Sequence, residues 1–317
     1  MAAMGIDLGG TKIISALFDN DGAILCKTAH LLEKRSGAEV GRLVLQTIDE
    51  LMSLSGQNVE ILETIGICVP GIADSKTGLV WAPNIPGWEH YPLQKEIEDY
   101  IKNKWVKVRV ASDRTCYILG ETWKGVAKGA ENAVFVAVGT GIGMGILVDG
   151  RILHGHADIT GAAGWMALNM QYEADYPQYG CFESNASGNG IARCALRLIG
   201  EGKYKGSILH QYDPDCITAR EVFDAYDAED PLAGAVIDKA IQLWGMAAAN
   251  MVSLLNPEII VWGGGIFGPA VKFLPRIKAE ACRWAQPIAV AQVEFVASQL
   301  GGDAGLYGAG KLGGVES

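Results

Sequence analysis

Two glycine-rich turns, each flanked by apolar stretches, constrain the fold of this 317-residue chain more than any other feature. The first turn, Asp7-Leu8-Gly9-Gly10-Thr11-Lys12, lies between the apolar stretches 3–8 and 13–18. The second, Gly139-Thr140-Gly141-Ile142-Gly143, lies between 133–138 and 143–148. Because an internal repeat indicates related structural units, we expect a strand-turn-strand unit at the start of each of two similar halves.

The composition of both turns suits a phosphate group. Glycine allows the backbone to approach a ligand closely and to adopt positive φ, and successive N–H groups in such a turn form an anion-binding concavity. For either turn alone, an ordinary tight hairpin is an equally good interpretation. The presence of two copies favours a nucleotide site, with Asp7 able to serve its metal ion.

A third glycine turn follows the apolar stretch 258–262. Its spacing, Gly263-x-Gly265-x-x-Gly268, fits the G-x-G-x-x-G fingerprint and leaves a dinucleotide-binding alternative open. That fingerprint also needs an acidic residue at a strand end about 20 residues later. Glu280 lies at about this distance, but it is in a stretch with a helical pattern and not at a strand end.

A near match to a phosphate-binding loop occurs close to the C-terminal end. Gly305-x-x-x-x-Gly310-Lys311 is followed by Leu312 in place of the serine or threonine that would contact a metal ion. We therefore interpret this segment as a helix rich in small residues.

Strand and helix patterns alternate along the chain, which predicts an α/β fold with mixed sheets and flanking helices. The strands are expected near 3–8, 13–18, 23–28, 64–69, 106–110, 133–138, 143–148, 258–262 and 291–296. The helices are expected near 38–54, 92–103, 114–126, 190–199, 218–227, 232–255, 270–285 and 303–312. From the position of the second turn we expect a smaller domain of 1–113 plus 303–317 and a larger one of 114–302.

Asp113 is the candidate general base. It follows the strand-like run 106–110 and precedes a helix, so it lies where a strand becomes a helix between the two turn units. An N-cap is the structural alternative, since aspartate is favoured there. The two roles are compatible, because a capping carboxylate can also accept a proton from a substrate hydroxyl.

Composition excludes several classes of function. The net charge is -10 and the pI about 5.0, with no run of Lys and Arg, so we expect no nucleic-acid partner. No apolar segment reaches the roughly 18 residues of a membrane helix. Because an apolar strand pattern begins at residue 3, we expect neither a leader peptide nor an N-terminal DNA-binding module. The seven cysteines are scattered and contain no C-x-x-C pair, which favours reduced thiols in the cytoplasm.

The motifs together resemble the ROK family of sugar kinases and regulators, nearly from end to end. The matching segments, in order, are Asp7-x-Gly-Gly-Thr-Lys, Pro70-Gly71, Pro83-Asn84-Ile85-Pro86-Gly87-Trp88, Ser112-Asp113, Gly139-Thr140-Gly141-x-Gly143, Gly180-Cys181-x-Glu183 and Asn256-Pro257-Glu258…Gly263-Gly264-Gly265. The resemblance implies duplicated actin/hexokinase-like (ribonuclease H-like) domains, with ATP and Mg²⁺ in a cleft between them, and a homodimer.

The resemblance also implies roles for individual residues. Asp113 would be the general base, and Asp7 would serve Mg²⁺ through phosphate or water. Nucleotide contacts would come from Asp7, Gly9, Gly10, Thr11, Lys12, Gly139, Thr140, Gly141, Gly264 and Gly265. Substrate contacts would come from Gly71, Asn84, Ser112, Asp113, Trp165 and Glu183. Asn84 could instead anchor its loop, and Trp88 is expected in the core.

The chain departs from the family pattern where the sugar and a zinc ion would bind. ROK sugar kinases usually carry Ala-Gly-Glu-x-Gly-His before a Cys-x-Cys-Gly-x-x-Gly-Cys zinc loop. Here Ala162 replaces the glutamate and Trp165 the histidine, while Ala174 and Tyr176 replace two thiols and leave only Cys181. A structural zinc needs about four ligands, so we expect no zinc and a buried Cys181.

These changes affect the expected substrate. The lost carboxylate and imidazole would have paired hydroxyls of a gluco-configured sugar, and such pairs determine specificity strongly. We therefore expect an ATP-dependent kinase of a sugar or sugar derivative other than glucose. Trp165 could stack on a sugar face or fill the volume of the lost zinc loop. A non-catalytic sugar- or nucleotide-sensing protein and an ATPase acting on another protein are the alternatives.

Overall fold

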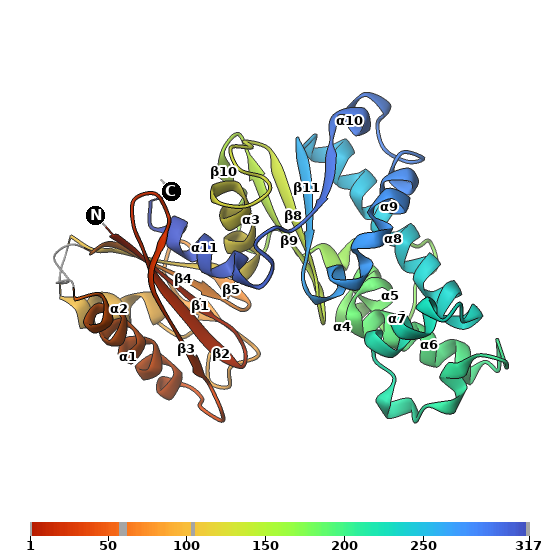
Figure 1. Ribbon diagram of the computed structural model, residues 1–317, viewed down its shortest axis with the longest axis horizontal. Coiled ribbons are helices and arrows are strands. Elements are labelled where there is room, and N and C mark those ends of the chain that lie inside the picture. The colour runs from red at the N-terminus through yellow and green to blue at the C-terminus, as the bar shows by residue number, and fades with distance from the viewer. Residues whose placement is uncertain (1, 57–61, 103–104, 315–317) are drawn as a thin grey trace. The chain divides into compact units, whose positions relative to one another are not determined.

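The computed structural model describes residues 2–56, 62–102 and 105–314, which form two compact units (Figure 1). Unit 1 comprises 1–130, 152–160 and 298–317, and unit 2 comprises 131–151 and 161–297, apart from the residues not described. Each unit is described below by itself.

Unit 1 is built on a five-stranded sheet in the order β3-β2-β1-β4-β7. The strands are β1 (Ala2–Leu8), β2 (Lys12–Phe18), β3 (Ile24–Leu31), β4 (Leu62–Val69) and β7 (Lys107–Ser112). β2 runs antiparallel to both β1 and β3, whereas β4 is parallel to β1 and β7 is parallel to β4. The pair β5 (Ile72–Ala73) and β6 (Val80–Trp81) forms a separate small hairpin.

Helices cover both faces of this sheet. One apolar cluster joins the strands to α1 (Ala38–Ser55) and α2 (Leu93–Ile101), and it includes Val40, Val44 and Ile48, which share a helix face. Other clusters join the strands to α3 (Asp113–Trp123) and α11 (Ala304–Leu312). Part of the helix predicted over 92–103 lies outside the described residues, since 103 and 104 are not described.

Glycines allow α11 to lie directly on the sheet. A Cβ at Gly5 would be 2.7 Å from the carbonyl oxygen of Leu306, and a Cβ at Gly66 would be 1.9 Å from that of Ala309. On the helix itself, a Cβ at Gly310 would be 2.6 Å from the Phe18 ring. The segment that resembles a phosphate-binding loop is therefore a small-residue packing helix, as predicted.

Unit 2 repeats the strand order of unit 1. Its sheet runs β10-β9-β8-β11-β12, with β8 and β9 antiparallel and β11 and β12 added in parallel. The strands are β8 (Ala133–Val138), β9 (Ile142–Val148), β10 (Arg151–Ile152), β11 (Ile259–Gly263) and β12 (Glu294–Ala297). Both sheets start with a hairpin and continue with two parallel strands, which confirms the duplicated α/β architecture expected from the two turns.

The helices of unit 2 bury a large apolar core against its sheet. They are α4 (Tyr176–Tyr179), α5 (Cys181–Ala186), α6 (Gly188–Gly200), α7 (Ala219–Asp227), α8 (Pro231–Leu255), α9 (Leu274–Ala281) and α10 (Pro287–Gln292). The longest, α8, is capped by Asp230, whose Oδ1 accepts hydrogen bonds from the N–H groups of Leu232 and Ala233. Asn256 ends α8 in the left-handed region.

Two predicted elements of unit 2 are wrong in detail. The single helix expected over 270–285 is a 3₁₀ segment, Pro269–Phe273, followed by α9, because Pro275 cannot continue the hydrogen-bond ladder of the preceding turn. The strand expected over 291–296 begins only at Glu294. Residues 287–292 form α10, whose start is set by Pro287 and by the Gln286 side chain accepting the N–H of Ala289.

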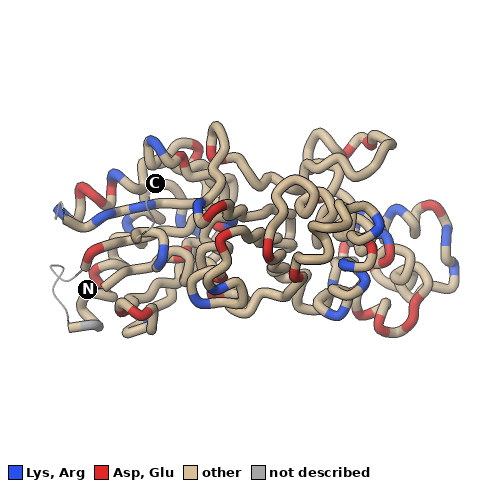
Figure 2. Tube along the Cα trace, turned by 90° about the horizontal axis from the view of Figure 1, so that it is seen from above, with Lys and Arg blue, Asp and Glu red and all other residues tan. Residues whose placement is uncertain are grey.

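The compact units also differ from the domain limits predicted at 113/114 and 302/303. The whole of α3 belongs to unit 1, because it packs along α11, and residues 152–160 and 298–302 join the same unit. Basic and acidic residues are interspersed along both units (Figure 2). Within the described residues, no helix has the length and apolar character needed to cross a membrane.

Candidate active site

The carboxyl ends of three parallel strands bring the acidic candidates of unit 1 to one edge of its sheet. The strand register pairs Asp7 with Cys68 and Cys68 with Ala111, so β1, β4 and β7 end at the same level. Asp113 follows β7 directly as the first residue of α3. Open α/β sheets bind ligands at this edge.

Asp7 is a partly buried carboxyl group with few partners. The Cys68 thiol donates a hydrogen bond to it, and a Cβ at Gly305 would lie 2.7 Å from its Oδ2, so only glycine leaves the group this space. Burial raises the pKa of Asp7 from 3.8 to about 6, and the nearby negative charge of Asp113 adds to the increase. The Cys68 hydrogen bond and the positive charge of Lys12 offset this increase only in part, so the surroundings as a whole disfavour the ionised carboxylate.

Ser112, rather than Asp113, caps α3. The Ser112 hydroxyl accepts the N–H of Thr115 at 3.4 Å, whereas Asp113 Oδ1 accepts the N–H of Arg114 at 2.8 Å. The capping alternative for Asp113 is thus wrong, because serine already fills that position. Burial raises the pKa of Asp113, partly opposed by the Arg114 charge and by this hydrogen bond.

The remaining unit 1 candidates surround the first glycine turn. Gly9 donates its N–H to the Lys12 carbonyl at 2.9 Å, and the Thr11 and Lys12 side chains are exposed. A Cβ at Gly10 would be 3.5 Å from Cβ of Asn84, which places the exposed Asn84 beside the turn. Trp88, in contrast, is buried and donates its Nε1–H to the Gly37 carbonyl at 3.0 Å, as expected of a core residue.

Gly71 has a structural reason to be glycine. Its φ is +112°, and a Cβ there would lie 2.2 Å from the carbonyl oxygen of Trp81 across the β5–β6 hairpin. A guanidinium nitrogen of Arg114 also reaches the Gly71 carbonyl at 3.4 Å. Gly71 therefore connects the end of β4 to the start of α3, next to Asp113.

In unit 2 the second glycine turn rests on the first turn of α6. Gly188 donates its N–H to the Gly139 carbonyl at 2.8 Å, and Asn189 donates to the Thr140 carbonyl at 3.5 Å. The turn closes through the Gly139 N–H and the Gly141 carbonyl at 2.9 Å. A Cβ at Gly139 would meet nothing within 4 Å, so the outer side of this turn is open.

The third glycine turn lies beside the second. Gly264 has a φ of +87°, and its Cβ would be 2.4 Å from the carbonyl oxygen of Val138, the last residue of β8. Gly265 has open space at its Cβ position and starts a short 3₁₀ segment, Gly265–Phe267. The dinucleotide alternative is not supported, because its fingerprint requires an α-helix opening directly from the glycine turn.

Glu183 supports the second glycine turn. Its Oε2 accepts the N–H of Ile142 at 2.7 Å, and a Cβ at Gly141 would be 2.6 Å from the same atom. Burial raises the pKa of Glu183, partly opposed by the Ile142 hydrogen bond and by the Arg193 charge. Oε2 is thus engaged with the backbone, whereas Oε1 and the second lone pair of Oε2 can still accept hydrogen bonds.

Trp165 does not fill the volume of the missing zinc loop. It is 56% exposed, whereas Tyr176 is buried and receives hydrogen bonds from Asn185 Nδ2 at 3.2 Å and Asn169 Nδ2 at 3.4 Å. Cys181 is buried, as expected. Among the described residues, no group of three or more histidine, cysteine or acidic side chains is placed to hold a metal ion.

Sequence patterns did not indicate Arg193. It lies on α6 with its guanidinium over the Tyr179 ring, 4.4 Å from the centroid, and its charge acts on Glu183. Its Nε and one terminal nitrogen are buried without a hydrogen-bond partner among the described groups. A lone arginine on a helix carries no local signal, so only the fold could reveal it.

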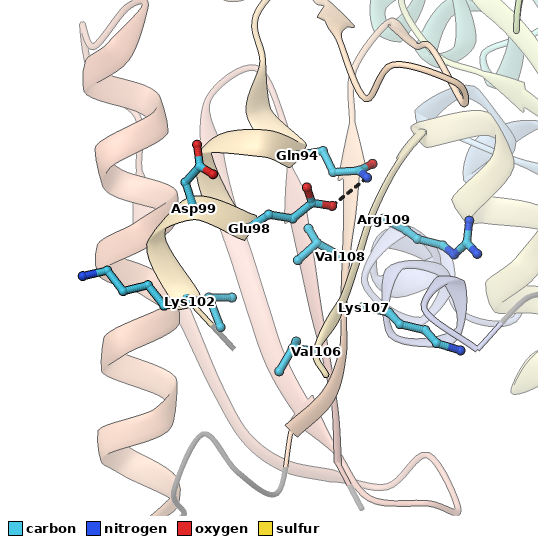
Figure 3. Close-up of a pocket in the computed structure, with 9 residues that line it drawn as sticks. Gln94, Glu98, Asp99, Lys102, Val106, Lys107, Val108 and Arg109 are labelled. Atoms are coloured by element: carbon cyan, nitrogen blue, oxygen red, sulfur yellow. Dashed lines mark hydrogen bonds between the residues drawn. The ribbon is translucent and has the colours of Figure 1, made fainter. Parts of the chain in front are cut away.

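A cavity of about 750 Å³ lies elsewhere in unit 1, between α2 and β7 (Figure 3). Its lining includes Glu98, which accepts a hydrogen bond from Gln94 at 2.9 Å, and Lys102. None of the predicted site residues lines it. We therefore do not assign this cavity as the active site, because the candidate catalytic residues lie at the carboxyl ends of the strands instead.

Two sheets of the same strand order, each with a glycine turn between its first two strands, define an actin/hexokinase-like phosphotransferase fold. The family model described as "ROK family" matches residues 3–313, and the chain belongs to the ROK family. A glucokinase from Halalkalibacterium halodurans is 35% identical over 98% of this chain and 94% of its own length.

Solved structures agree with this assignment. A ROK hexokinase from Thermus thermophilus superimposes with a TM-score of 0.82 at 27% identity, covering 99% of this chain and 98% of its own. A ROK family glucokinase from Streptomyces griseus in complex with glucose and AMPPNP gives 0.74 at 25% identity, covering 99% of each chain. The comparisons confirm the family, the fold and the enzyme class, a carbohydrate kinase.

Proposed function

We propose that this protein transfers the γ-phosphoryl group of ATP to a hydroxyl of a sugar or sugar derivative other than glucose, with Asp113 as the general base. The observation that carries the proposal is the environment of Asp113. Its carboxylate follows a parallel strand, is released from capping by Ser112, and has a pKa raised by burial. A raised pKa makes a carboxylate a better proton acceptor near neutral pH.

In this mechanism the chain's own residues position and deprotonate the acceptor. Asp113 takes the proton from the sugar hydroxyl as the hydroxyl oxygen bonds to the γ-phosphorus. The bond from the γ-phosphorus to the β,γ-bridging oxygen breaks, ADP leaves with that electron pair, and the proton ends on the Asp113 carboxylate. Backbone N–H groups of the two glycine turns hold the phosphates, and Thr11, Lys12 and Thr140 add side-chain donors. In phosphoryl transfer, such positioning and charge stabilisation supply most of the rate.

The Asp7 site fits a divalent cation. The pKa of this partly buried carboxyl group is raised in spite of the Cys68 thiol donor and the nearby Lys12 charge, and the adjacent glycine leaves space beside it, so it can accept further positive charge. Asp7 would hold Mg²⁺ through phosphate or water, and the ion would neutralise charge on the phosphates. Gly264 and Gly265, beside the second turn, would lie against the adenosine.

The exclusion of glucose as the substrate rests on two replaced residues. Ala162 and Trp165 remove a carboxylate and an imidazole from the sugar pocket expected for the family, while Glu183, Asn84 and Ser112 keep polar atoms there. A site that has lost hydroxyl partners discriminates against the sugar that needs them. We therefore propose a sugar other than glucose, even though the relative from Halalkalibacterium halodurans bears the name glucokinase.

The test is ADP release with ATP and Mg²⁺ against hexoses, ketoses, amino sugars, polyols and disaccharides. Asp113→Asn is expected to lower kcat on the best substrate by about 10²–10⁴-fold, with binding of that sugar retained. Asp99→Asn, at an exposed aspartate of unit 1, is the matched control. Undiminished turnover by Asp113→Asn would contradict the mechanism.

The same replacements favour one second candidate, a non-catalytic sugar- or nucleotide-sensing protein. It predicts sugar or nucleotide binding without phosphorylated product for every sugar tested. Homodimerisation stays a prediction from the family resemblance, and a cytoplasmic location stays a prediction from the scattered cysteines.

A further inference from the structure

A second cavity of about 270 Å³ opens in unit 2, next to the segment that replaces the zinc loop. Aromatic and apolar side chains dominate its lining, namely Trp165, Met170, Tyr172 and Tyr176, with Asn169 as a polar group. None of the lining residues carries a charge. We call this the aromatic cavity.

The aromatic cavity presents apolar surface that no other described part of the chain covers. Trp165 is 56% exposed, Tyr172 is 73% exposed and Met170 is fully exposed, all within eight positions of the sequence. Single exposed apolar residues are ordinary on protein surfaces, but a contiguous group beside a cavity marks a binding site. Aromatic rings also offer flat faces at low entropic cost to a ligand.

The floor of the cavity is held in place before any ligand arrives. The buried Tyr176 hydroxyl accepts hydrogen bonds from Asn169 and Asn185, and Lys239 Nζ donates to Asn185 Oδ1 at 2.8 Å. Tyr172 packs edge-on against Tyr176, with ring centroids 5.7 Å apart. Side chains ordered in this way lose little conformational entropy when a ligand binds.

The aromatic cavity adjoins the carboxylate that we assign to the substrate. A Cβ at Gly180 would be 2.7 Å from Cα of Trp165, and a Cβ at Gly164 would be 2.8 Å from Cβ of Glu183. Two glycines thus bring the backbone of Trp165 against the start of α5, two residues from Glu183. Glu183 therefore lies two residues along α5 from Cys181, which lines the cavity.

We propose that the aromatic cavity binds a second, uncharged sugar ring attached to the ring that is phosphorylated, so that the substrate class is a disaccharide. The inference rests on the proposed function. Uncharged, aromatic walls suit the C–H face of a pyranose, and the amide of Asn169 and hydroxyl of Tyr172 suit its hydroxyl groups. The lining has no cationic side chain, which favours an uncharged ring over one with a phosphate or carboxylate substituent.

The experiment compares disaccharides with their constituent monosaccharides. Cellobiose, maltose, lactose, sucrose and trehalose are assayed for ADP release beside glucose, galactose and fructose, and kcat/KM is determined for each. The wild-type protein is expected to favour one disaccharide by at least about tenfold over its monosaccharides. Trp165→Ala and Tyr172→Ala should each lower that preference by about tenfold.

Trp284→Ala is the matched control, since Trp284 is 58% exposed in the same unit but does not line the cavity. It should leave the preference unchanged. The inference would be overturned if the wild-type protein used disaccharides and monosaccharides equally well. It would also be overturned if Trp165→Ala and Trp284→Ala changed the preference equally. Either outcome would leave the proposed sugar kinase activity intact.

Calorimetric titration of the same disaccharides separates the two proposals. Binding that is lost in Trp165→Ala, without phosphorylation of any sugar, would support the cavity and refute the kinase. Neither binding nor turnover of any disaccharide would refute the cavity, and turnover of a monosaccharide alone would still support the kinase.

Discussion

The first and second glycine turns have the same strand-turn-strand framework but obtain their carboxylates differently. In unit 1, Asp7 lies on the strand that enters the turn, and its pKa is raised to about 6. In unit 2, the last residue of the corresponding strand is Val138, and the carboxylate comes from Glu183 on α5, where it binds the Ile142 N–H.

This difference indicates that the carboxyl groups beside the two turns have different roles. The Asp7 carboxyl group accepts a hydrogen bond from the Cys68 thiol, and burial raises its pKa, as expected of a group placed to bind a cation. Glu183 is tied to the turn itself, so its first task is to hold the backbone. We infer that the carboxyl group beside the first turn is available to a positive charge, whereas the one beside the second turn stabilises the backbone of its own unit.

Among substitutions at the two glycine turns and their carboxyl groups, the largest expected effect comes from Asp7→Asn. The amide has nearly the same shape but cannot offer a negative charge to Mg²⁺, so kcat should fall by about 10²–10³-fold. The measurement is ADP release at saturating ATP and sugar, with a melting curve to establish that the variant is folded. A decrease in kcat of less than fivefold would indicate that a residue other than Asp7 provides the negative charge for Mg²⁺.

Asp7 also predicts a pH dependence of stability in protein free of metal and nucleotide. Its folded pKa of about 6 exceeds the value of 3.8 expected in the unfolded chain. The folded state therefore binds the proton more tightly, and the stability that this provides below pH 4 is lost as the pH rises to 6. The loss is about 2–3 kcal/mol for a shift of about two pH units.

Urea unfolding in EDTA tests this prediction. Asp7→Asn should be more stable than the wild-type protein at pH 8 by that amount and equally stable at pH 4, because the neutral amide resembles the protonated acid. A constant difference at both pH values would show that the substitution acts through packing rather than charge.

Local sequence patterns predicted the parts of this comparison that depend on neighbouring residues. The two turns, their strands and most helices follow from apolar spacing and glycine. The pairing of Glu183 with the Ile142 N–H spans 41 positions and depends on where α5 packs, which no local pattern encodes. The choice between Ser112 and Asp113 as the cap of α3 also escaped prediction, since both types are good caps and the backbone decides.

Substitutions at Glu183 test the support of the second turn. Glu183→Ala leaves the buried Ile142 N–H without an acceptor and should lower the free energy of unfolding by about 1–3 kcal/mol. Glu183→Gln keeps an acceptor oxygen and should lose less than about 1 kcal/mol. Denaturant titration of both variants measures the difference. Equal losses would mean that the hydrogen bond does not hold the turn.

The smallest effect on stability is expected from alanine at the two turns themselves. A Cβ at Gly139 would meet nothing within 4 Å, and a Cβ at Gly10 would make only an ordinary contact of 3.5 Å with Asn84. The free energy of unfolding of Gly139→Ala and of Gly10→Ala should therefore stay within about 0.5 kcal/mol of the wild-type value. Gly264→Ala is the contrasting control, because its φ of +87° and a 2.4 Å approach to the Val138 carbonyl forbid a side chain.

Activity then separates ligand contact from folding at these two positions. A methyl group on a turn that touches phosphate should raise the KM for ATP by about tenfold without changing the melting temperature. An increase in both variants would mean that both turns approach the nucleotide. An increase in only one would assign the phosphates to that turn, and the other would be a structural hairpin despite its glycines.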